Sequence, residues 1–360
     1  MQLNILILPG DGIGTEVTCE AVKVLHKVAS KFHHQPVLQE GLIGGIAIHK
    51  TGGPLPQETI DLALKADATL MGAVGLPEFD NIAPDKRPER GLLGIRKALG
   101  VYANLRPVRS YKALLDSSPL KNTLVDGVDM IIVRELTGGI YYGTPRGISG
   151  SGQDERAVNT LSYTRPEIER VSRMAFRLAR NRRKKVTSVD KSNVIETSQL
   201  WRKVIIEVAE EFPDVALDHL LVDTAAMQIV LNPRRFDILV TENMFGDILS
   251  DEAAVLAGSI GMLPSASLGD KKPSGAWVGL YEPVHGSAPD IAGQSKANPF
   301  GAIGSVAAML EYSFGLKEEA AAVNRAVETV LNSGRVTADL KPAGKPSTTS
   351  EVGDAVAEAI

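Results

Sequence analysis

The chain has 360 residues, which is enough for two domains or one very large domain with a substantial core. Its apolar content of 44% and charged content of 23% are ordinary for a globular protein, and its single cysteine excludes an internal disulfide. A net charge of -4 with interspersed signs excludes a basic nucleic-acid surface, and no apolar run reaches membrane-spanning length. The expected partner is a small molecule or a second copy of the chain. An apolar segment begins at Leu3, so no targeting segment is expected and the expected location is cytoplasmic.

Strand-like segments alternate with helical segments along the chain. Strands are expected at residues 3–8, 69–74, 130–133, 185–189 and 236–241, and helices include 16–31 and 166–181. This alternation predicts an α/β fold with a largely parallel sheet. A different segment, 141–163, is rich in Gly and Ser and lacks a helical period, which predicts an extended hairpin arm of the kind that pairs between subunits. An exposed loop is expected at 269–279.

The first glycine-rich motif is Pro-Gly-Asp-Gly-Ile-Gly-Thr-Glu, at residues 9–16. It follows a strand and precedes a helix, as a dinucleotide-binding turn does. However, Thr15 stands where the Rossmann fingerprint needs its third glycine. Gly10, Gly12 and Gly14 are therefore interpreted as a tight turn between strand and helix.

The most informative segment is 237–252, where an apolar strand leads into a helix that carries Asp247 and Asp251. Their four-residue spacing places both carboxylates on one helical face. Two oxygen ligands at a strand-to-helix junction are typical of a Mg²⁺ or Mn²⁺ site, although a solvated acidic helix face is the alternative. Asp223, expected to close a strand at 220–222, is a third candidate ligand.

Arg96, Arg106 and Arg134 occur in contexts suited to binding a dianionic acid, because the guanidinium group binds a carboxylate with two hydrogen bonds. Arg134 is the strongest candidate, since it closes an apolar strand at the sheet edge where α/β sites form. Surface ion pairing is the alternative for each arginine.

Three further side chains are candidates for chemistry. Tyr141 follows a glycine pair and is a possible proton donor, with a buried structural tyrosine as the alternative. Lys191 follows a strand and is a possible base, with an ordinary exposed lysine as the alternative. His285 opens a loop whose small residues allow a backbone to approach a ligand.

Taken together, these segments resemble the β-decarboxylating dehydrogenases, the family of isopropylmalate, isocitrate, homoisocitrate and tartrate dehydrogenases. The resemblance covers nearly the whole chain. Residues 134–141, Arg-Glu-Leu-Thr-Gly-Gly-Ile-Tyr, are similar to the isopropylmalate version of the motif. The resemblance implies two α/β domains that share a large mixed sheet, without a Rossmann fold and with the arm at about 141–163. The implied first domain, which binds the cofactor, is 1–101 plus 258–360. The implied second domain, for dimerisation, metal and substrate, is 102–257.

The resemblance also implies a reaction, which is the NAD-dependent oxidative decarboxylation of 3-isopropylmalate to 4-methyl-2-oxopentanoate in leucine biosynthesis. Arg96, Arg106 and Arg134 then bind the malate carboxylates, and Asp247 and Asp251 hold Mg²⁺ or Mn²⁺. Lys191 and Asp223 are supplied by the second subunit of a homodimer with shared active sites. Lys191 serves as base and Tyr141 as acid. The residues implied to surround the isopropyl group are Glu89, Leu92, Leu93 and Val194.

The cofactor segment implied by the resemblance is the loop 285–298. Its matching positions are His285, Gly286, Ser287, Ala288, Asp290, Ile291 and Asn298. Asp290 matches the acidic residue that accepts ribose hydroxyls and repels a 2′-phosphate, which favours NAD over NADP. Asn193 matches a residue near the nicotinamide amide.

Three positions depart from the family pattern. Leu76 stands at a usual glycine, Ser192 at a common alanine, and Glu242 at a small or neutral residue. One alternative is therefore a paralogue that acts on another 3-substituted malate in a specialised pathway. Another is a catalytically silent homologue, against which the intact Arg, Tyr, Lys and Asp set argues.

Overall fold

The structure is a computed structural model that describes residues 1–272 and 275–360. It contains two compact units, described separately below. Unit 1 comprises Met1–Val101, Ser110–Asn122 and Ala254–Ile360, and unit 2 comprises Tyr102–Arg109 and Thr123–Ala253. Part of the expected loop at 269–279, residues 273 and 274, lies outside the described residues.

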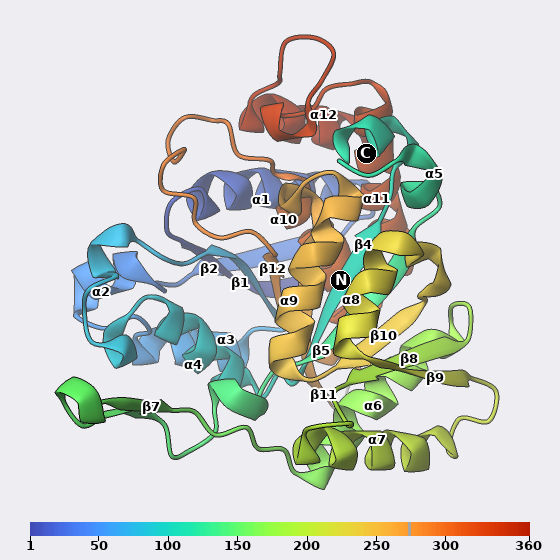
Figure 1. Ribbon diagram of the computed structural model, residues 1–360. Helices are drawn as coiled ribbons and strands as arrows, with labels where there is room; N and C mark the ends of the chain where they lie inside the picture. Colours follow the sequence, from blue (N-terminus) through green and yellow to red (C-terminus); the bar gives the residue numbers. More distant parts are fainter. Residues whose placement is uncertain (273–274) are drawn as a thin grey trace. The chain divides into compact units, whose positions relative to one another are not determined.

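The described residues of unit 1 contain five strands, of which β1, β2, β11 and β12 are labelled in Figure 1. In spatial order they are β2 (Gln35–Glu40), β1 (Gln2–Gly10), β3 (Ala68–Ala73), β12 (Trp277–Pro283) and β11 (Pro264–Lys271). The pairs of β1 with β2, β1 with β3 and β3 with β12 are parallel, whereas β11 and β12 are antiparallel. Its helices are α1 (Gly14–Lys31), α2 (Gly45–Thr51), α3 (Gln57–Lys65), α4 (Glu89–Leu99), α10 (Phe300–Tyr312), α11 (Lys317–Asn332) and α12 (Thr349–Ala359).

The helices of unit 1 pack through apolar faces. In α1, Val17, Val24 and Val28 recur at helical spacing and are fully buried. This face lies against α10 and α12, and α10 in turn packs on β11 and β12. Helix α10 is apolar on most sides because it lies between the strands and other helices. The loops of the candidate site begin at the carboxyl ends of β1 and β3.

Apart from the arm, the described residues of unit 2 contain a second set of five strands. In spatial order they are β4 (Ala103–Arg109), β5 (Asp129–Glu135), β10 (Ile238–Thr241), β8 (Lys185–Asp190) and β9 (Ala216–Leu221). The pair of β4 with β5 is antiparallel, whereas the pairs of β5 with β10, β10 with β8 and β8 with β9 are parallel. The helices are α5 (Asn122–Val125, at the boundary), α6 (Arg165–Arg180), α7 (Glu196–Ala209), α8 (Val222–Leu231) and α9 (Asn243–Ala254).

Helix α6 shows how local sequence defines these elements. It begins with a capping box, in which the Thr164 side chain and Glu167 satisfy each other's backbone N–H groups, and Pro166 occupies the first turn. Its buried face includes Ile168 and Val171 and packs on β5 and β10. It also contacts α7, and Phe176 stacks on Phe212 with ring centroids 5.1 Å apart.

The arm of unit 2 is a small antiparallel hairpin of β6 (Gly147–Ser149) and β7 (Arg156–Val158). Its residues are exposed, and the apolar side chain of Ile148 is 73% exposed. A two-stranded hairpin is marginally stable by itself. The predicted hairpin is therefore confirmed, while its pairing with a second subunit stays a prediction.

The α/β class is confirmed, as are the strands expected at 3–8, 69–74, 130–133, 185–189 and 236–241 and the helices expected at 16–31 and 166–181, with shifts of one or two residues at most ends. One boundary expectation is wrong. The strand before Asp223 is β9, which ends at Leu221, and Asp223 lies in the first turn of α8. Within residues 1–272 and 275–360, no helix combines the length and the apolar character needed to cross a membrane.

Candidate active site

Strand β5 and helix α9 bring Arg134 and Asp247 together in unit 2. Arg134 is the penultimate residue of β5, and its guanidinium group forms a hydrogen-bonded ion pair with Asp247. Its Nε also donates to Asn243 Oδ1 at 2.9 Å. Gly246 allows this approach, because a Cβ atom there would lie 2.6 Å from Arg134 Cγ. The helix therefore passes directly over the arginine side chain.

A second arginine joins this cluster from β4. Arg106 lies 3.6 Å from Asp247 and 3.3 Å from Asp251, and its guanidinium group donates to Ser250 Oγ at 2.5 Å. Its Nε donates to Asn104 Oδ1 at 3.0 Å. The predicted convergence of Arg106, Arg134, Asp247 and Asp251 is therefore present within one unit.

Tyr141 completes the cluster. Its hydroxyl donates to Asp247 Oδ2 at 3.1 Å, and the guanidinium of Arg134 lies 5.9 Å from its ring centroid. Burial raises the pKa of the Tyr141 phenol, and the Asp247 carboxylate raises it further, with Arg134 opposing. A phenol held protonated beside a carboxylate is suited to donating a proton.

The charges of the cluster are balanced. Two arginine side chains that are more than nine-tenths buried face two carboxylates, of which Asp247 is 35% exposed and Asp251 is 59% exposed. Burial raises the pKa of Asp251; Arg106 lowers it and Asp247 raises it. The expected repulsion between the two acids is thus offset by the arginines. The partly exposed carboxylate oxygens of Asp247 and Asp251 are hard ligands that suit Mg²⁺ or Mn²⁺.

Lys191 and Asp223 form a separate pair. The Lys191 Nζ donates to Asp223 Oδ1 at 2.7 Å, and this contact lowers the pKa of Asp223. No group of three His, Cys, Asp or Glu residues capable of holding a metal occurs in the described part of the chain. Asp223 therefore does not join Asp247 and Asp251 within one chain. Asn193 and Val194 follow Lys191 and are exposed.

In unit 1, the glycine motif after β1 packs against the loop that begins at His285. Gly12 has φ +56° and approaches Ser287 so closely that a Cβ atom would lie 2.1 Å from its carbonyl oxygen. That oxygen accepts the N–H of Ile13 at 2.8 Å. Gly10 has φ +71° and likewise lies against the Ala73 backbone. The predicted tight turn is confirmed, and the structure shows that it also supports the loop at 285–288.

Several groups of this loop are candidates for contact with a ligand. The imidazole Nε2 of His285 is buried without a hydrogen-bond partner, while Nδ1 lies 2.9 Å from the Gly286 carbonyl oxygen. Burial lowers the pKa of His285, which favours the neutral ring. Asp290 is exposed, and Ala288 has φ +37°. An unpaired buried nitrogen beside close-packed backbone fits the binding of a cofactor. The remaining candidates, Gly286 and Ile291, lie in the same loop.

Asn298 holds the far end of this segment. Its Nδ2 donates to Asp339 Oδ2 at 2.9 Å, and its Oδ1 accepts the N–H of Phe300 at 3.0 Å. Both polar ends of the Asn298 side chain are therefore used within unit 1. This arrangement indicates that Asn298 shapes the loop.

Helix α4 carries the candidate residues for the substrate side chain. Glu89 is exposed in the first turn of α4 and lies beside Gly75, where a Cβ atom would be 3.4 Å from its carboxylate. The Ser287 hydroxyl lies beside the same glycine, 3.3 Å from that Cβ position. Leu92 packs partly buried on the core of unit 1, and Leu93 is also partly buried. Arg96 is buried and donates to Glu282 at 2.6 Å, with its Nε unpaired.

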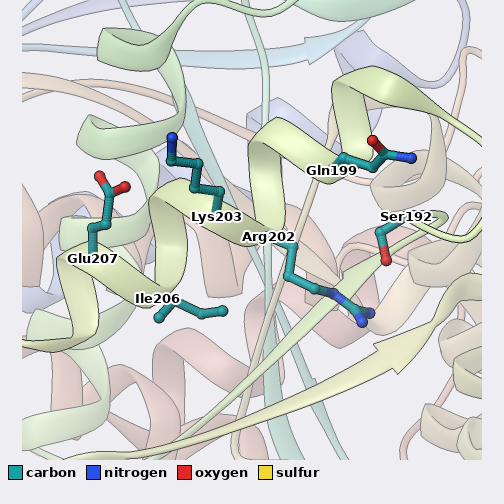
Figure 2. Close-up of a pocket in the computed structure, with 6 residues that line it drawn as sticks. All are labelled: Ser192, Gln199, Arg202, Lys203, Ile206 and Glu207. Carbon is teal, nitrogen blue, oxygen red and sulfur yellow. The ribbon is translucent and has the colours of Figure 1, made fainter.

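The three departures from the family pattern have different environments. Leu76 packs over the start of α2, since a Cβ atom at Gly45 would lie 2.5 Å from its Cδ1. Ser192 lines an open groove of about 550 Å³ along α7, where its N–H donates to Asp190 Oδ1 at 2.9 Å. Figure 2 shows the residues that line it, which are Ser192, Gln199, Arg202, Lys203, Ile206 and Glu207. Glu242 is buried at the start of α9, with hydrogen bonds considered below.

Sequence analysis missed two residues that organise these sites. Asp11 is 3% exposed and accepts the N–H groups of Gly45, Ile46 and Gly75 at 2.7, 2.8 and 2.8 Å. It therefore ties the turn after β1 to α2 and to the loop after β3. Its position between two glycines was the available signal. Tyr163, at the end of the arm, contacts the residues around Glu242.

Comparisons with known proteins show the family of the chain. The sequence model of the family described as isocitrate/isopropylmalate dehydrogenase matches residues 4–356. The chain is 56% identical to a 3-isopropylmalate dehydrogenase of Halalkalibacterium halodurans, covering 100% of this chain and 98% of that protein. It is 60% identical to the 3-isopropylmalate dehydrogenase of Geobacillus kaustophilus, covering 95% and 91%.

Solved structures share the fold. An isocitrate dehydrogenase from Methylococcus capsulatus has a TM-score of 0.87 and 35% identity, covering 99% of each chain. A β-decarboxylating dehydrogenase from Thermococcus kodakarensis has a TM-score of 0.79 and 34% identity, covering 99% of this chain and 96% of that one. The match is therefore not confined to one unit, and the chain belongs to the isocitrate/isopropylmalate dehydrogenase family.

Proposed function

We propose that the chain catalyses the oxidative decarboxylation of 3-isopropylmalate by NAD with the help of Mg²⁺ or Mn²⁺, which is a step of leucine biosynthesis. The observation that carries this proposal is the cluster of two arginines, two aspartates and one tyrosine in unit 2. The relatives named 3-isopropylmalate dehydrogenase, at 56% and 60% identity, favour this substrate over isocitrate.

Substrate binding follows from the charges. Arg106 and Arg134 present guanidinium groups to which the malate carboxylates bind, and Arg96 is the third candidate for this role. Asp247 and Asp251 would hold the metal ion. A dianionic substrate and a divalent cation enter together without changing the net charge of the cluster, which limits the cost of charge burial.

The chemistry assigns one proton transfer to each of two side chains. Lys191 would take the proton of the C2 hydroxyl, directly or through water, and NAD bound beside the substrate would accept the hydride from C2. A metal ion held by Asp247 and Asp251 would polarise the C2 oxygen and would stabilise the negative charge that develops there when CO₂ leaves. Tyr141 then donates its proton to the carbon that lost the carboxylate, in keeping with its raised pKa. The products are 4-methyl-2-oxopentanoate, CO₂ and NADH.

Two subunits are part of the proposal. Lys191 pairs with Asp223 rather than with the cluster of its own chain. This separation supports a homodimer in which each active site takes Lys191 and Asp223 from the second subunit. The exposed apolar groups of the arm, including Ile148, are suited to such pairing.

The remaining roles concern selectivity. Glu89, Leu92, Leu93 and Val194 would surround the isopropyl group, where apolar contacts suit a branched alkyl and leave the third carboxylate of isocitrate unpaired. In the loop at 285–298, Asp290 would accept the ribose hydroxyls of NAD, with Asn193 near the nicotinamide. The glycine-supported loop of unit 1 and the unpaired His285 Nε2 support this cofactor role.

A direct assay tests the proposal. NADH formation is followed with Mn²⁺ and 3-isopropylmalate, isocitrate, tartrate, malate or bulkier 3-substituted malates. The expected result is a strong preference for 3-isopropylmalate and for NAD over NADP. A preference for a bulkier malate would show that the proposed substrate is wrong but that the proposed reaction type is right. No turnover of any of these substrates would contradict the proposal that the chain is an enzyme of this type.

A further inference from the structure

Tyr163 and Glu242 form a buried polar contact beside the catalytic cluster that the proposed reaction does not use. Tyr163 is 7% exposed and Glu242 is 5% exposed. The Tyr163 hydroxyl donates to Glu242 Oε2 at 3.3 Å. Burial raises the pKa values of both groups. Burying these groups is unfavourable unless their hydrogen bonds are made, so the partners of each one show what the pair does.

The first role of the pair is to cap helix α9. Glu242 accepts the N–H of Phe245 at 2.9 Å and that of Met244 at 3.2 Å. The Tyr163 hydroxyl accepts the N–H of Asn243 at 2.9 Å. The first N–H groups of a helix have no partners within the helix, so these three contacts fix the start of α9. Asp247 lies one turn further along the same helix.

The second role is to support the turn that precedes Tyr141. A Cβ atom at Gly138 would lie 2.6 Å from Tyr163 Cε1, and one at Gly139 would lie 2.5 Å from the Tyr163 hydroxyl oxygen. The backbone of this glycine pair therefore packs directly against the ring and hydroxyl of Tyr163. Asn243 Nδ2 also donates to the Gly138 carbonyl at 3.1 Å. Tyr141 follows two residues after Gly139.

These contacts connect the two elements that carry the proton donor and its partner. Helix α9 presents Asp247, and the glycine turn presents Tyr141, whose hydroxyl lies 3.1 Å from Asp247 Oδ2. We infer that Tyr163, bonded to Glu242, is a positioning residue that sets the distance between Tyr141 and Asp247. Tyr163 does not touch the reacting atoms in this scheme. The inference rests on the proposed function for its kinetic effect, but the contacts themselves are independent of the substrate.

Removing the Tyr163 hydroxyl tests this inference. Tyr163→Phe keeps the ring under the glycine pair but leaves the Asn243 N–H and Glu242 Oε2 without their shared partner. We expect kcat with 3-isopropylmalate, NAD and Mn²⁺ to fall about tenfold, because small displacements of reacting groups slow the chemical step. The KM for NAD should not change, since the loop at 285–298 belongs to unit 1.

Tyr281→Phe is the matched control. The Tyr281 hydroxyl is fully buried and lies 2.6 Å from Ser313 Oγ, in unit 1 and outside the catalytic cluster. We expect a similar fall in Tm for both variants but a loss of kcat only in Tyr163→Phe. Equal kcat values in the two variants would overturn the positioning role. If Tyr163→Phe does not fold, Glu242→Gln replaces it, and an unchanged kcat in that variant would overturn the inference.

Hydrogen exchange separates this inference from the proposed function. In Tyr163→Phe, the amides of residues 243–245 and those of residues 139–143 should both exchange faster than in the wild-type protein. This measurement does not need a substrate. A joint increase supports the coupling even if wild-type protein fails to oxidise 3-isopropylmalate, in which case only the proposed function fails. An increase in one segment alone, or in neither, would overturn the inference.

Discussion

The candidate sites of the two units are built by opposite means. In unit 2, five charged or phenolic side chains converge, and their contacts with one another define the site. In unit 1, glycines with positive φ bring the backbone after β1 against the loop at 285–288, so the absence of side chains defines the site. The comparison shows that the cluster of unit 2 depends on which side chains are present, whereas the proposed cofactor loop of unit 1 depends on glycines, where a Cβ atom would block the close backbone approach.

Tyr141→Phe is the strongest way to break the side-chain site. The substitution removes the proton donor and its bond to Asp247 but keeps the ring near Arg134. We expect kcat to fall by about 10²–10⁴, the usual contribution of a general acid, with little change in Tm. Steady-state kinetics of NADH formation measures the change. Tyr142→Phe removes the neighbouring phenol as a control, and comparable activity in both variants would refute the role of Tyr141.

Asp290→Lys tests the loop site by charge. A lysine removes the acceptor for the ribose hydroxyls, so we expect the KM for NAD to rise about tenfold, equivalent to about 1.4 kcal/mol. The KM for 3-isopropylmalate should stay within error. Asp270→Lys makes the same charge change at another exposed position of unit 1. Should the two variants use NAD equally well, Asp290 does not contact the cofactor.

Gly12→Ala tests whether close backbone approach builds the loop site. A Cβ atom at Gly12 meets the Ser287 carbonyl oxygen at 2.1 Å, whereas nothing lies within 4 Å of a Cβ atom at Gly52, which has φ +83°. We expect Gly52→Ala to lower the free energy of unfolding by about 1 kcal/mol through backbone strain alone. Gly12→Ala should cost about 3 kcal/mol or more. Denaturant unfolding measures both, and equal losses would show that strain, rather than the contact with Ser287, sets the cost.

The sequence predicted the side-chain site better than the backbone site. The spacing of Asp247 and Asp251 and the position of Arg134 at a strand end located the cluster, because helical and strand periods determine which faces side chains share. The glycines of residues 9–14 were identified as a turn, but their contact with Ser287 joins segments more than 270 residues apart and leaves no local signal. The partners of Glu242 could not be predicted for the same reason, since Tyr163 lies 79 residues away along the chain.

The position of Lys191 was predicted correctly at the end of a strand, yet its partner in the chain is Asp223 rather than the cluster. The proposed assembly of two chains would reconcile this position with the proposed role of Lys191 as base. The account therefore depends on whether Lys191 and Tyr141 in one active site come from different subunits.

Complementation between two inactive variants measures this directly. Tyr141→Phe and Lys191→Ala are each expected to lose most turnover, with Lys203→Ala as the surface-lysine control. When the two inactive chains are co-expressed in equal amounts, half of the dimers combine them, and each mixed dimer then has one site with both residues intact. The account predicts recovery of about a quarter of wild-type activity. Activity no higher than that of the separate variants, with mixed dimers shown to form, would contradict a site shared between subunits.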